Sequence, residues 1–156
     1  MKTLRHIFLS VAVATSALAQ DPSSSPSPSP SPSPEPLPSA ALRVKLSDLA
    51  GALSNEGFKT RDRVWSGKIK AGVTPRLAVN LFRGNQYWFC AAMDPEIESP
   101  QITVFGPDGK AVEVIKHSEP GVASAGVTAG STGQYFVEIE SGSGPASDFC
   151  FLYLFK

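Results

Sequence analysis

Few residues of this chain could do chemistry, and their spacing does not join them into a site. Nucleophilic catalysis needs a base beside the nucleophile, and after His6 the sequence has one further histidine, His117. It lies in the polar stretch 116–120, which is typical of a solvated turn. The Gly-x-Ser-x-Gly, His-Glu-x-x-His and glycine-rich phosphate motifs do not occur. We therefore interpret His117 as a surface residue and expect neither catalysis nor a cofactor.

Two groups of acidic residues have the chemistry for other roles. Asp94, Glu96 and Glu98 offer carboxylate oxygens for Ca²⁺, but a calcium site built by protein alone needs about six to eight oxygen ligands. The three acids therefore indicate an acidic loop without metal, with calcium binding as the alternative. Glu138 and Glu140 alternate with apolar residues, which predicts the solvated face of a strand and not an acid and base acting on a glycoside.

The two cysteines, Cys90 and Cys150, both lie in the part of the chain that we expect to be exported. An oxidising compartment lets thiols pair, so we predict a disulfide between them. The chain-entropy model gives a bond closing this loop a contribution of about 4 kcal/mol. A pair of free buried thiols is the alternative. Two sulfurs and a remote histidine do not complete a tetrahedral metal shell.

The N-terminal residues predict export. Lys2 and Arg5 precede an apolar run at 7–18, and Ala17 and Ala19 supply the small residues of a signal-peptidase site. We expect a signal peptide at 1–19, cleaved before Gln20, with a retained segment as the alternative. The run is shorter than the ~20 residues of a membrane span, so no span is expected after cleavage. The predicted location is secreted or periplasmic.

Residues 20–39 are rich in serine and proline. Proline fixes φ and removes amide donors, so this segment predicts a disordered, semi-rigid polyproline II stalk. The remaining residues, 40–156, have the usual length of one domain with its own core.

The charge is balanced overall but unevenly distributed. The chain has 14 basic and 14 acidic residues. The expected cleavage removes two basic residues and leaves the mature chain with more acidic than basic side chains. A slightly negative net charge argues against a nucleic-acid partner. Residues 40–83 hold nine basic and three acidic side chains, whereas 84–156 hold three and nine. We expect these charges to pair across neighbouring strands. The alternative is a basic surface that attracts anionic envelope polymers, formed by Lys59, Arg61, Arg63, Lys68 and Lys70.

Periodicity divides the domain into a helix and a β region. Leu46, Leu49 and Leu53 recur at helical spacing within 42–58, where Ser47 is a candidate N-cap and Gly57 the end. From Trp65 the period becomes two. Turn signals then separate about eight strands, which predicts an all-β, jelly-roll-like antiparallel β-sandwich. These strands are expected near 65–70, 77–82, 86–93, 102–104, 112–114, 122–128, 135–140 and 149–155.

The alternation also predicts which side chains share a face. Tyr87 and Phe89 take one face of their strand, and Trp88 and Cys90 take the other. In the last strand, one face is aromatic and is expected to join Tyr87 and Phe89 in the core, and the other carries Cys150; the aromatic residues are Phe149, Phe151 and Tyr153. The last strand is apolar on both faces, so something must cover Leu152, Leu154 and Trp88. The leucine stripe of the helix is the expected cover. Without it, this outer patch would be the best candidate binding surface.

Three segments and the aromatic last strand carry a family resemblance: GNQYWF at 84–89, ITVFGPDGK at 102–110 and STGQYFVEI at 131–139. Over about residues 64–155 their order resembles the bacterial pre-peptidase C-terminal domain, a small extracellular jelly roll found beside secreted enzymes. The aspartate-rich run that many such modules use for calcium is not evident before Ile102. The resemblance implies binding or accessory work outside the membrane.

Together these features predict a non-catalytic binding or accessory module whose partner is an extracellular glycan or protein surface. Trp88, Lys68 and Lys70 are the candidate binding residues, because tryptophan stacks on sugar rings and lysines attract anions. A tryptophan in a small β domain more often fills the core, and this is the alternative for Trp88. The alternative function is a structural envelope protein that self-associates through its opposed charges and apolar outer patch.

Overall fold

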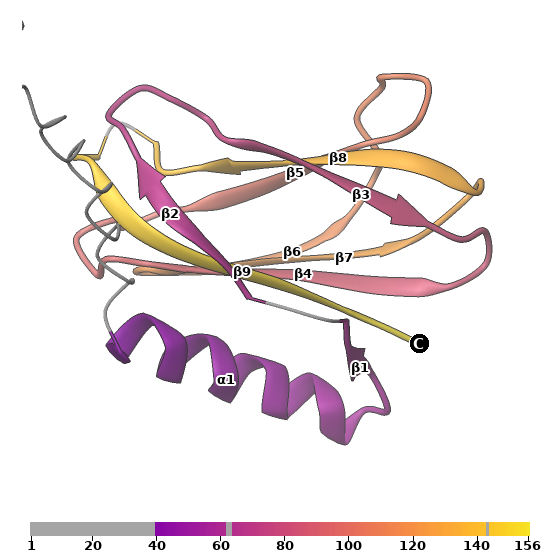
Figure 1. Cartoon of the computed structure of the whole chain (residues 1–156), viewed down its shortest axis with the longest axis horizontal. Coiled ribbons are helices and arrows are strands. Elements are labelled where there is room, and N and C mark those ends of the chain that lie inside the picture. Colours follow the sequence, from indigo (N-terminus) through magenta and orange to yellow (C-terminus); the bar gives the residue numbers. More distant parts are fainter. Residues whose placement is uncertain (1–39, 62–63, 143) are drawn as a thin grey trace, which may run out of the picture. The chain divides into compact units, whose positions relative to one another are not determined.

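The computed structural model describes residues 40–61, 64–142 and 144–156; the expected signal peptide at 1–19 and stalk at 20–39 lie outside them. The described chain forms one helix and nine strands in two antiparallel sheets (Figure 1). The predicted all-β sandwich is therefore confirmed.

The two sheets interleave early and late strands. The larger sheet contains β1 (Lys59–Thr60), β2 (Trp65–Ile69), β4 (Gln86–Met93), β6 (Ile115–Glu119), β7 (Val122–Thr128) and β9 (Ser147–Phe155). The smaller sheet contains β3 (Arg76–Leu81), β5 (Gln101–Phe105) and β8 (Gly133–Glu140). Their orders are β1-β9-β4-β7-β6, with β2 also on β9, and β3-β8-β5. This interleaving is jelly-roll-like, except that β6 pairs with β7 instead of extending the smaller sheet.

The main core lies between the sheets and is rich in aromatic rings. Tyr87, Phe89 and Phe151 are among its largest fully buried side chains. The ring centroids of Phe89 and Phe151 lie 6.3 Å apart, and Trp65 stacks on Tyr153 at 5.7 Å. Aromatic rings bury large apolar areas, so these contacts stabilise the pairing of β9 with β4 and with β2. The predicted inner face of both strands is confirmed.

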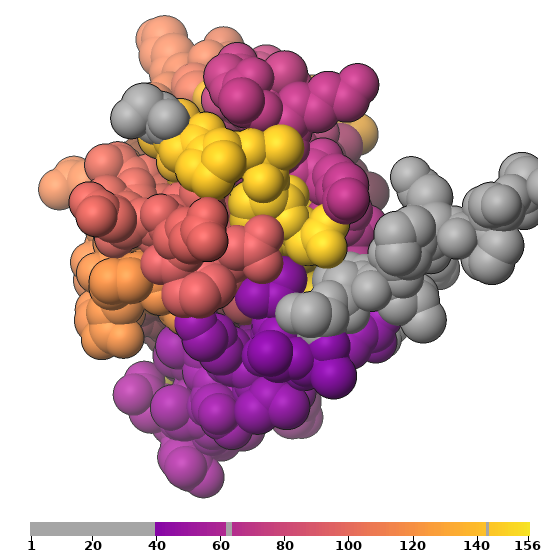
Figure 2. Space-filling model, turned by 90° about the vertical axis from the view of Figure 1, so that its left-hand side faces the viewer, coloured from indigo at the N-terminus to yellow at the C-terminus, as the bar shows by residue number. Residues whose placement is uncertain are grey.

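A second core lies on the outer face of the larger sheet, under α1 (Ala40–Asn55). The helix buries Leu42, Leu46 and Leu53 against Leu152 and other outer residues of β4 and β9. Figure 2 shows atoms of α1 directly against those of the yellow C-terminal strand. The predicted cover is therefore present over Leu152 and Leu154, whereas Trp88, the third residue of the patch, is only partly buried.

The end of α1 follows the sequence signal, whereas its start does not. The amide of Gly57 donates to the carbonyl of Ser54 and that of Phe58 to Leu53, and Gly57 has a φ of 91°. This is a Schellman motif, which needs a residue in the left-handed region and is completed by the contact between Phe58 and Leu53. The helix begins at Ala40, so the predicted N-cap Ser47 is wrong. Leu42 extends the buried stripe by one turn.

One predicted hairpin has the expected turn but lacks its second strand. The amide of Gly109 donates to the carbonyl of Gly106 at 2.9 Å, and Phe105 bridges to Ala111. After Val112 the chain leaves this sheet, and the next strand is β6 in the other one. The predicted strand at 112–114 is therefore wrong, because those residues form the crossing between sheets.

We expect the helix cover to be a main source of stability. Leu46→Ala should lower the free energy of unfolding by about 2 to 5 kcal/mol, because it leaves a cavity under a fully buried side chain. Val44→Ala, on the exposed face of the same helix, is the control and should change little. Urea unfolding followed by circular dichroism measures both, and equal midpoints for the two variants would contradict the packing of α1.

Candidate functional site

Cys90 and Cys150 lie on neighbouring strands under α1, and both are free thiols. The predicted disulfide is therefore wrong. Cys90 pairs with Leu152 and Cys150 with Ala92, so the two cysteines are diagonal neighbours on one face. Diagonal Cα atoms lie about 7 to 8 Å apart, whereas disulfides need about 4.4 to 6.8 Å. The face was predicted correctly, but the register separates the sulfurs.

Burial suppresses ionisation of both thiols. Removal from water raises the pKa of Cys90 to about 12. It also raises the pKa of Cys150, although the charge of Arg43 on α1 opposes that shift and Asp148 adds to it. Because the thiolate is the reactive form, neither cysteine is a nucleophile near neutral pH.

We expect both thiols to stay free and protected in the folded protein. Ellman's reagent at pH 8 should label neither cysteine in the native protein, and should label both after unfolding in guanidinium. Above the ordinary thiol pKa of 9.0 the unfolded chain ionises first, so this pair should lower stability as pH rises toward about 12. A native mass short of two hydrogens, or rapid native labelling, would contradict the assignment.

Lys68 and Lys70 do not join Trp88 in one site. Lys68 pairs across strands with Asp148, and its Nζ lies 3.8 Å from the Asp148 carboxylate. Trp88 pairs with Leu154, six residues further along the same strand β9, a separation of about 20 Å. Lys70 is exposed just beyond the end of β2. The expectation that charges pair across strands is met at Lys68.

The acidic loop is partly used to hold the fold. The Oδ2 atom of Asp94 accepts hydrogen bonds from the hydroxyl of Ser147 at 3.0 Å and the amide of Asp148 at 3.2 Å. These contacts fasten the start of β9 to the end of β4. Glu96 and Glu98 line a separate hollow of about 340 Å³. Within the described ranges, no group of three or more His, Cys, Asp or Glu side chains is arranged to hold a metal ion.

The other candidates for chemistry lie apart from one another. His117 is exposed on β6, and its Nε2 lies 3.2 Å from the carboxylate of Glu119. Glu138 accepts a hydrogen bond from Nε of Arg76 at 2.8 Å. The Arg76 guanidinium lies 5.0 Å from the ring centre of Phe105, so that ring is partly covered. Glu138 thus has a structural partner across strands.

Trp88 lines a groove on the outer face of the larger sheet, next to the second core. The groove has a volume of about 430 Å³, within the usual range for ligand sites. β4 contributes Gln86 and Trp88, β7 contributes Thr128, and Glu113 and Ile115 come from the start of β6 and the residues before it. One aromatic side chain, two uncharged polar side chains and one acid therefore converge beside α1.

The position of Trp88 depends on a glycine. Gly126 faces Trp88 across the β4–β7 pair, and a Cβ atom there would lie 2.8 Å from the indole ring. The six-membered part of the indole therefore rests directly on the backbone of β7. This contact lets the ring lie low over the sheet and form a wall of the groove.

We expect Gly126→Ala to displace Trp88. The added methyl group should lower stability by about 1 to 3 kcal/mol and shift the tryptophan fluorescence. Gly130→Ala is the matched control, because a Cβ there meets no atom within 4 Å. Fluorescence and urea unfolding measure both variants. If Gly126→Ala behaves like Gly130→Ala, the ring does not rest on this glycine.

The groove has a simple electrostatic character. Apart from the buried Tyr87, Glu113 is the one ionisable side chain among the residues that line the groove. An acidic or neutral groove favours neutral or cationic ligands over polyanions. Sequence alone identified Trp88 but missed the other four side chains. Gln86 and Thr128 meet through the β4–β7 pairing, whereas Glu113 and Ile115 reach the groove because the chain crosses into the larger sheet before β6.

A scan of the chain against protein-family models finds no match, and no curated protein matches it. Among the described residues, no helix has the length and apolarity needed to cross a membrane.

Proposed function

We propose that this protein is a secreted or periplasmic, non-catalytic binding module that holds a neutral glycan in the Trp88 groove. The observation that carries the proposal is the arrangement of the groove: an indole wall with uncharged polar side chains beside it. Indole faces stack on the C–H faces of sugar rings, and Gln86 and Thr128 offer donors and acceptors for hydroxyl groups.

Further support comes from what surrounds the groove. Trp88 is half-buried against the second core, so its ring is held in place and loses little freedom on binding. The separation of His117, Glu138 and the buried thiols supports a binding role without catalysis. The resemblance to the pre-peptidase C-terminal domain and the N-terminal export pattern support accessory work outside the cytoplasm.

Trp88→Ala should weaken glycan binding about tenfold or more, because stacking is lost. The chain has two tryptophans, so Trp65→Phe leaves Trp88 as the single fluorophore. Titrating that variant with neutral oligosaccharides such as chitohexaose and cellohexaose should give a saturable emission shift. Lys68→Gln, remote from the groove, is the control and should bind as the parent does. Equal affinity of Trp88→Ala and the parent would refute the proposal.

Self-association in the envelope is the second candidate. All five residues of β6 are exposed, and no described strand pairs with its outer edge. Such an edge can pair with a strand of a second copy. Sizing chromatography separates the two functions: salt-sensitive oligomers that persist in Trp88→Ala favour self-association, and a monomer at every salt concentration counts against it.

A further inference from the structure

One end of the sandwich gathers positive charge around an exposed aromatic ring. We call this group the basic tip and define it as Lys59, Arg61, Phe82, Arg83 and Lys156. Lys59 belongs to β1 and Arg61 follows it, Phe82 and Arg83 lie between β3 and β4, and Lys156 follows β9. The residues come from three segments far apart in sequence.

Backbone pairing brings these segments together. Gln86 and Lys156 exchange two hydrogen bonds, of 3.0 and 2.9 Å, which hold the turn before β4 against the end of β9. Lys59 pairs with Phe155, and the amide of Arg61 donates to the carbonyl of Tyr153 at 3.0 Å. The convergence is therefore fixed by the sheet and does not depend on flexible side chains.

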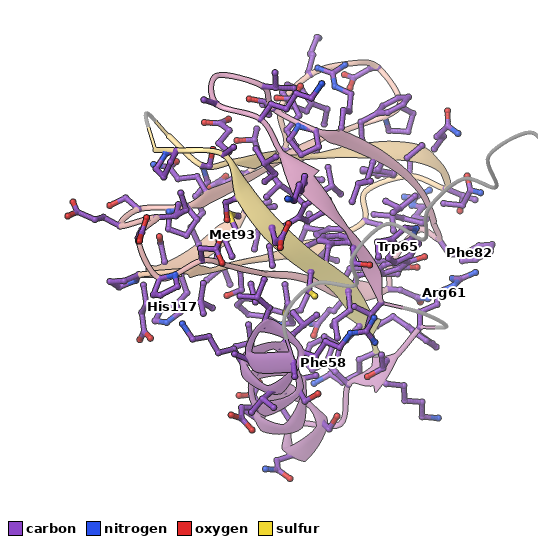
Figure 3. All side chains as sticks on the ribbon, turned by 60° about the vertical axis from the view of Figure 1, so that its left-hand side comes forward. Phe58, Arg61, Trp65, Phe82, Met93 and His117 are labelled. Atoms are coloured by element: carbon purple, nitrogen blue, oxygen red, sulfur yellow. The ribbon has the colours of Figure 1, made fainter. Side chains whose placement is uncertain are left out.

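Phe82 is the apolar element of the basic tip. Its side chain is 50% exposed, and Figure 3 shows it beside Arg61 at the edge of the molecule. The Arg61 guanidinium lies 5.8 Å from the centre of the Phe82 ring and 6.0 Å from that of Phe155. A single exposed phenylalanine would need no explanation. Phe82 needs one because it lies among four cations, so that charged and apolar groups share one surface.

Within the part of the chain that the structure describes, no Asp or Glu side chain forms an ion pair with a cation of the basic tip. Among the described residues, Lys68 and Arg76 have ion-pair partners, whereas the four cations of the basic tip have none. Lys156 instead donates to the carbonyl of Glu56 at 3.3 Å, near the end of α1. Residues 56–61, 82–86 and 153–156 contain one acidic side chain, that of Glu56. The described residues at this end therefore carry a net positive charge.

We propose that the basic tip docks on an anionic phospholipid bilayer, with the ring of Phe82 entering the headgroup region. Each basic side chain near such a surface strengthens binding about fivefold, and an apolar side chain that leaves water adds to it. A soluble polyanion would engage the cations but would leave Phe82 in water, so the bilayer accounts for more of the surface. This inference is independent of the Trp88 groove.

Vesicle co-sedimentation tests the proposal. The exported form of the protein is purified from its producing cells. It is mixed with vesicles of phosphatidylglycerol and phosphatidylcholine, or with vesicles of phosphatidylcholine alone. We expect binding to the anionic vesicles that weakens with salt. Lys59→Gln combined with Arg83→Gln should weaken it about twenty-fivefold, and Phe82→Ser about tenfold. Lys68→Gln and Val73→Ser are the matched controls, since Val73 is 53% exposed in the loop before β3.

Phe82→Trp reports on the ring itself. Its added fluorescence should be quenched by lipids brominated on their acyl chains, and that quenching should disappear when Lys59 and Arg83 are also replaced by Gln. Absence of binding to anionic vesicles, or absence of quenching at position 82, would overturn the proposal. If Phe82→Ser binds vesicles and soluble polyphosphate as the parent does, the surface recognises anions alone and insertion is wrong.

Discussion

Burial of β4 and β9 on both faces is the constraint on which the rest of the structure depends. Phe89, Phe151 and their neighbours fill the space between the sheets. Leu152 and Leu154, on the opposite face of β9, are buried as well. A strand that is apolar on both sides stays soluble only if both sides are covered. The smaller sheet covers one side and α1 covers the other (Figure 1). The sandwich is thus a three-layer arrangement at its centre and a two-layer one toward β6.

This constraint explains why much of the fold was predictable from sequence. Strict alternation assigned Tyr87 and Phe89 to one face and Cys90 to the other. The outer face of the last strand was the apolar surface that needed a cover, so the leucine stripe of the helix could be placed on it. Gly57 marked the helix end because the Schellman turn needs a positive φ. These features are local or periodic, and periodic patterns survive whatever the register between strands is.

The failures concern quantities that a periodic pattern does not contain. A shift of two residues keeps every side chain on its face, so parity placed Cys90 and Cys150 correctly but did not reveal that they are diagonal. The crossing of 112–114 to the larger sheet changed which residues surround Trp88. The basic half of the sequence likewise split into paired cations such as Lys68 and the unpaired ones at the other end. Sites made by convergence of distant segments require the topology.

The place of β9 in the larger sheet has a consequence for biogenesis. Residues 147–155 pair with β1, β2 and β4, so none of these three strands has its full set of partners until β9 has been synthesised. Long-range pairing of this kind has a high contact order and folds slowly. A nascent chain of this topology therefore cannot complete its larger sheet until its last strand has left the ribosome.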